Sequence, residues 1–189
     1  QIYFDFYGYS LIAIGIAYFF GFRFPQNFAR PYEALNARDF WRRWHMTLSS
    51  WIRDYLYMPL GGRVNFARNI LIVFTVVGLW HGAAWTFVMW GLYHAFLVIS
   101  YTLTQRWWDR MIPAVQIGLT FILVTLGWVL FLFDFENIGA FFASLVGYGS
   151  GAIGAANSEM WLFLIIAAGI CFGINFERII VRERRRTME

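Results

Sequence analysis

The stretch Asn69–Leu103 reads NILIVFTVVGLWHGAAWTFVMWGLYHAFLVISYTL. It contains no Arg, Asp or Glu, and its only imidazoles are His81 and His94. A run this long and this apolar is typical of a segment inside a lipid bilayer. An ionisable side chain at that depth is costly to bury and commonly has a function. We therefore take His81 as the chemical centre, since Gly78 and Gly82 bracket it and allow the helix to bend or break there.

The composition of the whole chain supports the same environment. It is 60% hydrophobic and 22% aromatic, with only 14% charged residues and a mean hydropathy of +0.54. Soluble domains carry about 25% charged residues. The composition predicts an all-α integral membrane protein. Because the chain begins at the edge of an apolar stretch, we expect it to be a fragment of a longer protein.

We expect one transmembrane domain over residues 1–189, with spans at 3–22, 114–133 and 160–176 and two short crossings within 69–103. As one helix, 69–103 would be about 52 Å long, which is too much for one untilted span. Two crossings also place every Arg on one side, as the positive-inside rule favours. The C-terminus is then cytoplasmic. The acidic loop 134–159, with a short helix over 138–146, is then external, and 106–110 forms a charged interface loop.

The segment between the first two apolar regions is basic. From residue 23 to residue 68 it holds eight Arg against three acids, a balance of 8 − 3 = +5. Its apolar positions over 36–58 share one side of a helical wheel, which predicts an amphipathic interfacial helix. Asn36 is the expected N-cap, and Asp39 is expected to pair with Arg42 or Arg43. His45 falls on the seam of the wheel, so it either faces a cavity or lies at the membrane interface.

The chemistry available to this chain is that of imidazole. A neutral His in a partly dry cavity is a competent general base near neutral pH. No G-x-S-x-G elbow is present, and no CxxC or HExxH spacing supports a metal site, so we expect no bound metal. Taken alone, His81 could equally be a core histidine. Four further residues are candidates for lining a substrate passage: Trp44, Ser49, Trp80 and Trp85.

Three motifs resemble the membrane-bound O-acyltransferase family: Arg38–Ser49 (RDFWRRWHMTLS), Arg53–Gly62 (RDYLYMPLGG) and Gly78–Ala83 (GLWHGA). The similarity is to the bacterial branch that contains alginate O-acetyltransferase and teichoic-acid D-alanyl transfer proteins. Asp5–Ser10 (DFYGYS) and Asn27–Tyr32 (NFARPY) look like the same branch. Family members are longer, so the chain would be the C-terminal part of one.

The resemblance implies a ring of transmembrane helices, with amphipathic and re-entrant helices, around a central tunnel. His81 matches the histidine regarded as catalytic, and His45 matches a second histidine facing the same tunnel. The donor would be a cytoplasmic acyl thioester, acyl-CoA or an acyl-carrier protein, with no tightly bound cofactor. The acceptor would be an extracytoplasmic hydroxyl, reached with a periplasmic partner, at the bacterial inner membrane. Acetyl is the expected acyl group, and D-alanyl is the alternative.

The chain departs from the family pattern at two places, and two other classes of function compete. Leu132-Phe133-Asp134 stands where the branch usually shows an Arg, and the linker Arg63–Asn69 is short, which leaves the identity of the acceptor open.

Haem-mediated electron transfer would use His81 and His94, which on one helix would point about 140° apart. A non-catalytic membrane conduit or assembly subunit is the other rival. Partners are otherwise membrane lipid, and no nucleic acid is expected.

Overall fold

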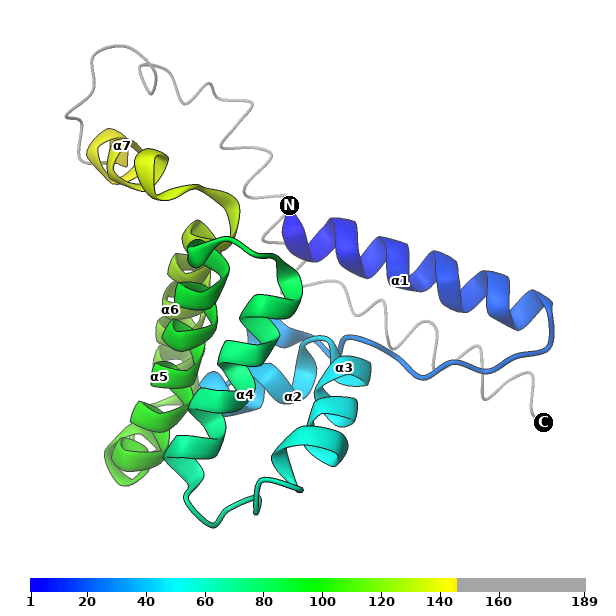
Figure 1. Cartoon of the computed structure of the whole chain (residues 1–189), viewed down its shortest axis with the longest axis horizontal. Coiled ribbons are helices and arrows are strands. Elements are labelled where there is room, and N and C mark those ends of the chain that lie inside the picture. The colour runs from blue at the N-terminus through cyan, green and yellow to red at the C-terminus, as the bar shows by residue number, and fades with distance from the viewer. Residues whose placement is uncertain (146–189) are drawn as a thin grey trace. The chain divides into compact units, whose positions relative to one another are not determined.

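The computed structural model describes residues 1–145. Gln1–Leu132 form one unit, and a second unit begins at Phe133. In chain order the elements are α1 (Ile2–Phe19), a 3₁₀ turn (Pro31–Glu33), α2 (Ala37–Arg43), α3 (Met46–Ile52), a π-helical turn (Arg53–Tyr57), α4 (Phe66–His81), α5 (Trp85–Trp108), α6 (Pro113–Leu132) and α7 (Phe135–Leu145) (Figure 1). No strand occurs within the described range, and the chain is an all-α protein as predicted.

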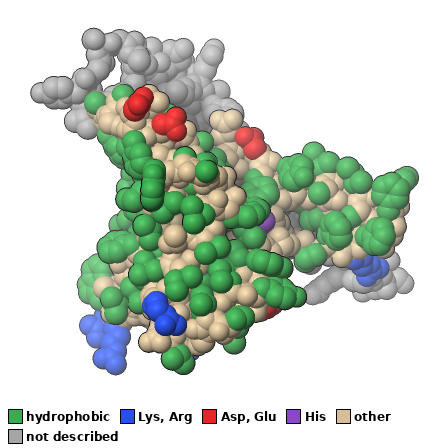
Figure 2. Space-filling view, in the orientation of Figure 1, with side chains coloured by type: hydrophobic (Ala, Val, Ile, Leu, Met, Phe, Trp, Pro, Cys, Tyr) green, Lys and Arg blue, Asp and Glu red, His purple; other side chains and the backbone are tan. Residues whose placement is uncertain are grey.

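Three of these helices, α1, α5 and α6, are long and apolar enough to cross a membrane. Hydrophobic side chains cover most of the face of the first unit seen in Figure 2, over α1 and over the group formed by α4, α5 and α6. A surface this apolar is stable against lipid rather than water. The chain is an integral membrane protein. The predicted spans 3–22 and 114–133 correspond to α1 and α6, whereas 160–176 lies outside the described residues.

The stretch 69–103 is divided into two helices immediately after His81. α4 ends at His81 and α5 begins at Trp85. A Cβ added at Gly78 would lie 2.3 Å from the backbone oxygen of Phe87, and one added at Gly91 would lie 2.2 Å from that of Phe74. These two contacts run in opposite directions along the chain, so α4 and α5 are antiparallel neighbours whose backbones touch. Glycine is required at both positions.

Two boundaries differ from the prediction. α4 has 16 residues and is shorter than the three candidate spans, so the two-crossing topology stays a prediction. α5 continues to Trp108 and takes in the first part of the loop expected at 106–110. It continues because that end is anchored: the indole Nε1 of Trp108 donates to the carbonyl oxygen of Leu35 at 2.8 Å, and Tyr101 donates to Asp109 at 3.2 Å.

The predicted helix over 36–58 is three elements rather than one. α2 ends at Arg43, and His45 has a left-handed backbone conformation with φ 46° and ψ 53°. A non-glycine residue in that region interrupts a right-handed helix, so α3 starts afresh at Met46. A π-helical turn follows α3. The amphipathic pattern continues through the break because it depends on residue type, whereas the break depends on contacts with another part of the chain.

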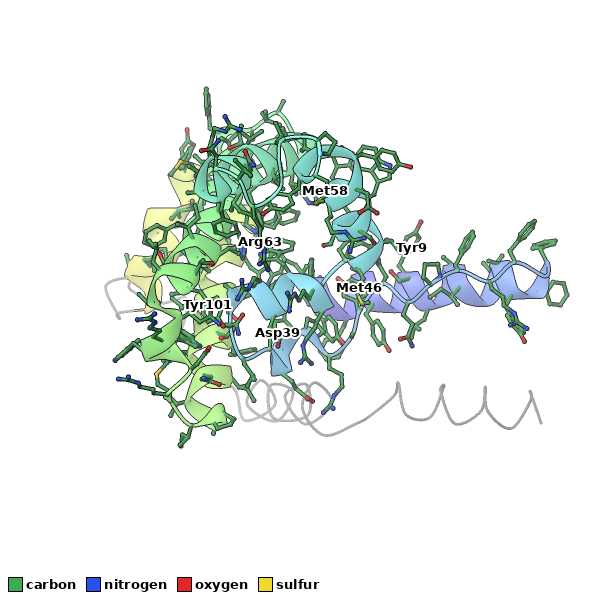
Figure 3. All side chains as sticks on the ribbon, turned by 90° about the horizontal axis from the view of Figure 1, so that it is seen from below. Tyr9, Asp39, Met46, Met58, Arg63 and Tyr101 are labelled. Atoms are coloured by element: carbon green, nitrogen blue, oxygen red, sulfur yellow. The ribbon has the colours of Figure 1, made fainter. Side chains whose placement is uncertain are left out.

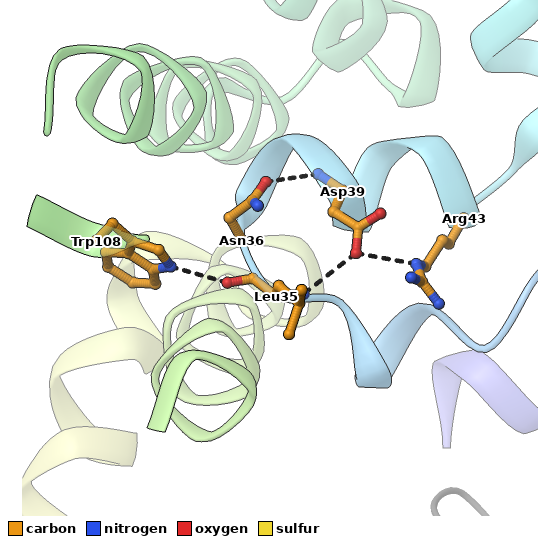
Figure 4. A network of polar contacts seen from close by, with 5 residues as sticks. All are labelled: Leu35, Asn36, Asp39, Arg43 and Trp108. Carbon is orange, nitrogen blue, oxygen red and sulfur yellow. Dashed lines mark hydrogen bonds and ion pairs between the residues drawn. The ribbon is translucent and has the colours of Figure 1, made fainter. Parts of the chain in front are cut away.

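The start of α2 agrees with the prediction. The side-chain oxygen of Asn36 accepts a hydrogen bond from the backbone N–H of Asp39 at 2.8 Å, which makes Asn36 the N-cap (Figure 4). Asp39 pairs with Arg43 at 3.0 Å, not with Arg42, and accepts from the backbone N–H of Leu35 at 3.2 Å. The spacing of four residues between Asp39 and Arg43 puts them on one side of the helix.

An aromatic core joins α1, the following loop, α2, α5 and α6. The indole of Trp44 is 4% exposed and lies between Phe28, Phe40 and Trp128, with ring-centroid distances of 5.0, 5.5 and 4.9 Å. Tyr3 and Phe6 of α1 pack on the same cluster. Close packing of rings holds these elements together, since burial against lipid-like surroundings provides little driving force.

The second unit contributes one described helix. α7 spans Phe135–Leu145, where a short helix over 138–146 was expected. Phe133 and Phe141 stack with their ring centroids 5.0 Å apart. Residues 146–159 of the predicted acidic loop lie outside the described residues.

Candidate functional site

A cavity of about 370 Å³ lies between α2, α3, the π-helical turn and α4. The wall from α4 is apolar and includes Phe66, Val73 and Phe74. The remaining wall comes from the basic segment and includes both Ser49 and His45. It is an apolar hollow with polar groups from one side, which is the usual composition of a site for a small organic ligand.

Four guanidinium groups line this cavity: Arg38, Arg42, Arg53 and Arg63 (Arg63 is labelled in Figure 3). Two of them are engaged, since Arg53 pairs with Asp54 at 2.7 Å and the guanidinium of Arg38 lies 5.2 Å from the ring centroid of Tyr101. Arg42 and Arg63 have no ion pair or hydrogen bond among residues 1–145. The cavity therefore carries unpaired positive charge beside an apolar surface, which suits a ligand with an anionic group and an apolar arm.

His45 reaches the cavity from the junction of α2 and α3. Its Nδ1 lies 2.9 Å from the side-chain oxygen of Asn27, and the ring of Phe6 packs edge-on at 4.8 Å. Burial, and to a smaller extent the electrostatic effect of His81, lower the pKa of His45 from 6.5 to about 4. His45 is therefore a neutral imidazole at pH 7 and can accept a proton or a hydrogen bond.

His81 is the last residue of α4 and is half-buried among aromatic rings. Its ring lies 5.1 Å from both Trp90 on α5 and Phe131 on α6, and 4.9 Å from Trp80. It has no hydrogen-bond partner within the described range, and it does not line the cavity that His45 lines. The structure brings the two imidazoles close enough to interact electrostatically, from helices 36 residues apart in the sequence.

The other candidate residues are placed as follows. Ser49 lines the cavity, and its hydroxyl donates to the backbone oxygen of Trp44 at 3.3 Å. Trp44 itself is buried in the aromatic core, whereas Trp80 and Trp85 are 64% and 74% exposed. None of these three tryptophans lines the cavity. Their role in lining a substrate passage stays a prediction.

His94 lies apart from the site, in the interior of the aromatic core. It is fully buried, and neither ring nitrogen has a hydrogen-bond partner among the described residues. The haem alternative considered His81 and His94 on a single helix, but they belong to α4 and α5. The rings of His81 and His94 each lie 5.1 Å from the ring of Trp90. In the sequence, the two histidines stand on opposite sides of the break between α4 and α5.

Sequence patterns missed three residues that the structure places at the site. Trp41 lines the cavity, Trp90 packs on His81, and Asn27 holds His45. Trp41 and Trp90 are tryptophans on apolar helix faces, where such residues are common, so the sequence does not distinguish them from other core residues. Asn27 is different, because an amide five residues after the predicted span 3–22 and four residues before Pro31 has no local use as a helix cap.

The comparison with family models shows the family of this chain. The model described as MBOAT, the membrane-bound O-acyltransferase family, matches residues 1–134. The chain belongs to the membrane-bound O-acyltransferase family. The matched range includes every described element of the site: the cavity, His45 and His81.

Comparison with individual proteins supports the same family. The chain is 48% identical over 139 residues to a peptidoglycan O-acetyltransferase of Helicobacter pylori, a match that covers 69% of this chain and 26% of that protein. It is 39% identical over 175 residues to a probable alginate O-acetylase of Azotobacter vinelandii, covering 88% and 35%. A teichoic acid D-alanyltransferase of Bacillus subtilis is 34% identical over 149 residues, covering 69% and 38%. The chain spans about a third of the length of these relatives.

Proposed function

We propose that this chain forms the catalytic part of an O-acyltransferase that moves an acyl group from a cytoplasmic thioester to an extracytoplasmic hydroxyl. The observation that carries the proposal is an imidazole, His45, on the wall of an apolar cavity with unpaired arginines, with a second imidazole, His81, close enough to act on it electrostatically. Membership of the O-acyltransferase family supports the reaction class. Two of the relatives are named for O-acetyl transfer, which favours acetyl, and the D-alanyltransferase of Bacillus subtilis keeps D-alanyl as the alternative.

In the proposed mechanism His81 is the general base. It takes the proton of the acceptor hydroxyl as the hydroxyl oxygen attacks the thioester carbonyl carbon. The new ester C–O bond forms, the C–S bond breaks, and the thiolate leaves with the proton returned by His81. No acyl-enzyme is needed, since the acceptor attacks the donor directly and the described site offers no cysteine. His45, neutral at pH 7, orients the substrate.

The charge of the cavity supports a donor that carries phosphate. Acyl-CoA and acyl-carrier thioesters share a phosphate joined to a long, flexible arm. Arg42 and Arg63 would pair with the phosphate, while the apolar α4 wall would pack against the methyl and methylene groups of the arm. We propose that the basic segment and the C-terminus lie on the cytoplasmic side of a bacterial inner membrane, which the distribution of Arg along the sequence supports. A periplasmic partner would deliver the acetyl group to a polysaccharide.

The proposal is tested by replacing His81 with Ala and with Gln in the full-length protein. Both variants lack a base at this position, so we expect acyl transfer from radiolabelled acetyl thioester to fall by about 10²-fold or more. Thr104→Ala, an exposed change on α5 away from the cavity, is the control and should keep wild-type activity.

The same experiment separates the enzyme from a non-catalytic conduit. A conduit would bind the donor and support acetylation in cells equally well with either His81 variant. Wild-type transfer by both variants, in protein that is folded and membrane-inserted, would exclude His81 as the base and would favour the conduit.

A further inference from the structure

The loop that follows α1 contacts the turn between α2 and α3 at His45 through Asn27. Asn27 hydrogen-bonds three consecutive residues on the opposite segment. Its backbone oxygen accepts from the N–H of Met46 at 2.8 Å, and its side-chain oxygen accepts from the hydroxyl of Thr47 at 2.9 Å and faces Nδ1 of His45 at 2.9 Å. One residue thus holds both the backbone turn and the ring at position 45.

The orientation of the Asn27 amide follows from its neighbours. The backbone N–H of Thr47, 3.4 Å from the same side-chain atom, can only donate. An amide turned the other way would bring two N–H groups face to face. The amide nitrogen instead donates to the hydroxyl oxygen of Ser10 at 3.2 Å, and Ser10 is buried on α1. The atom facing His45 is therefore an oxygen that cannot donate.

This orientation decides where the proton of His45 lies. A neutral imidazole carries one N–H, and the nitrogen opposite an acceptor oxygen is the one that keeps it. Nδ1 faces the Asn27 oxygen, so Nδ1 carries the hydrogen and Nε2 carries the free lone pair. In this form His45 cannot donate a hydrogen bond to a developing oxyanion. It can only accept one, or accept a proton.

We propose that Asn27 is a positioning residue that holds His45 as the Nδ1–H tautomer, so that Nε2 accepts a hydrogen bond from a substrate hydroxyl. The identity of that hydroxyl, an acyl acceptor, rests on the proposed function. The proposal assigns His45 the role of orienting a hydroxyl, because that role needs a hydrogen-bond acceptor, whereas stabilising an oxyanion would need a donor. The left-handed backbone at His45, fixed by the Asn27–Met46 bond, sets the direction of the ring.

Of the groups around His45, only Asn27 fixes which ring nitrogen carries the hydrogen. Charged groups lining the same cavity are the arginines of α2, the π-helical turn and the following loop, which remain cationic at all relevant pH values. His81 acts on His45 from α4 by electrostatic interaction. α1 contributes the aromatic ring of Phe6, which cannot accept or donate a proton. Among these groups only the Asn27 oxygen is paired with a ring nitrogen of His45.

The test compares Asn27→Asp with Asn27→Ala in the full-length protein. Aspartate keeps an acceptor opposite Nδ1 but adds a negative charge, which stabilises the imidazolium. We expect kcat near wild type at high pH, with the acidic limb of the kcat profile moved up by about one pH unit or more. Alanine removes the acceptor, and we expect kcat to fall about tenfold or more at unchanged donor KM, comparable to losing the partner that orients a metal-binding histidine.

Asn36→Asp is the matched control, since it makes the same chemical change at a helix N-cap, where a carboxylate accepts the Asp39 N–H equally well. Its pH profile should equal that of the wild type. An Asn27→Asp profile identical to the wild type, or an Asn27→Ala enzyme with wild-type kcat, would overturn the proposal.

A second measurement does not depend on activity. Long-range ¹H–¹⁵N correlation spectra of protein labelled with ¹⁵N-histidine report which ring nitrogen carries hydrogen, and His45→Asn identifies the signal. We expect protonated Nδ1 at neutral pH in the wild type and a changed pattern in Asn27→Ala. A protonated Nε2 in the wild type would refute the tautomer. The correct tautomer in a protein without acyl transfer would leave the positioning role standing and refute only the proposed function.

Discussion

His45 combines a left-handed backbone with a depressed pKa, and both properties can be tested with one substitution. Asn tolerates φ 46° better than other side chains, so His45→Asn removes the imidazole while keeping the turn. The folded-state pKa of about 4 lies below the unfolded value of 6.5. As pH falls from 6.5 toward 4, the unfolded chain gains a proton at His45 that the folded chain does not, so the wild type loses stability in that window. Unfolding midpoints measured in detergent should fall more steeply with acid in the wild type than in His45→Asn.

Above pH 6.5 both states carry a neutral His45, so the pH dependence of the two proteins should run in parallel there. Parallel curves also between pH 6.5 and 4.5 would contradict the depressed pKa. His94 is present in both proteins and cancels in the comparison, as does His81 apart from its electrostatic interaction with His45.

At the scale of elements, the contact between α4 and α5 places His81 beside Trp90. Gly78 and Gly91 permit this contact, because a Cβ at either one would meet a backbone oxygen on the other helix, which cannot move aside cheaply. We expect Gly78→Ala and Gly91→Ala each to destabilise the protein by about 1–3 kcal/mol, as overpacking does, and to reduce activity by displacing His81. Thermal unfolding of the purified variants measures the first effect.

Gly118→Ala on α6 is the matched control, since nothing lies within 4 Å of the added Cβ. Alanine has the higher helix propensity, so this change should be neutral or slightly stabilising, by at most about 1 kcal/mol. Equal unfolding midpoints for Gly91→Ala and Gly118→Ala would show that the two backbones do not touch.

At the scale of the whole molecule, four of the ten arginines within residues 1–145 line one apolar cavity. If Arg42 and Arg63 attract the phosphate of a thioester donor, then Arg42→Gln/Arg63→Gln should raise the donor KM several-fold with kcat nearly unchanged. The wild-type KM should rise with added salt, since salt screens this attraction. The variant should respond less to salt. Initial rates at a series of donor and salt concentrations provide both quantities.

Arg106→Gln/Arg110→Gln removes the same charge from the end of α5, away from the cavity, and should leave KM and its salt dependence unchanged. An equal effect of the two double variants would point to the net charge of the protein rather than to the cavity.

The features that the sequence determined alone are those set by neighbours along the chain. The apolar run 69–103 predicts membrane helices because its hydrophobicity is local. Gly78 and Gly82 predicted a bend or break near His81 because glycine weakens a helix, and the break occurs at Gly82. The Asn36 cap, and a pair of Asp39 with either Arg42 or Arg43, were predictable because residues three and four apart are neighbours on a helix. His81 and His45 stood out as scarce imidazoles within motifs that resemble those of one family.

Only the tertiary structure decided what those residues touch. The wheel over 36–58 predicts one helix, but the bonds from Asn27, 18 residues before His45, divide it. Periodicity also does not distinguish Trp44, buried by Phe28 and Trp128, from the exposed Trp80, because the covering residues come from other helices. The pairing of His45 with Asn27, and the tautomer that follows, depend on contacts between distant segments, and no local pattern encodes such contacts.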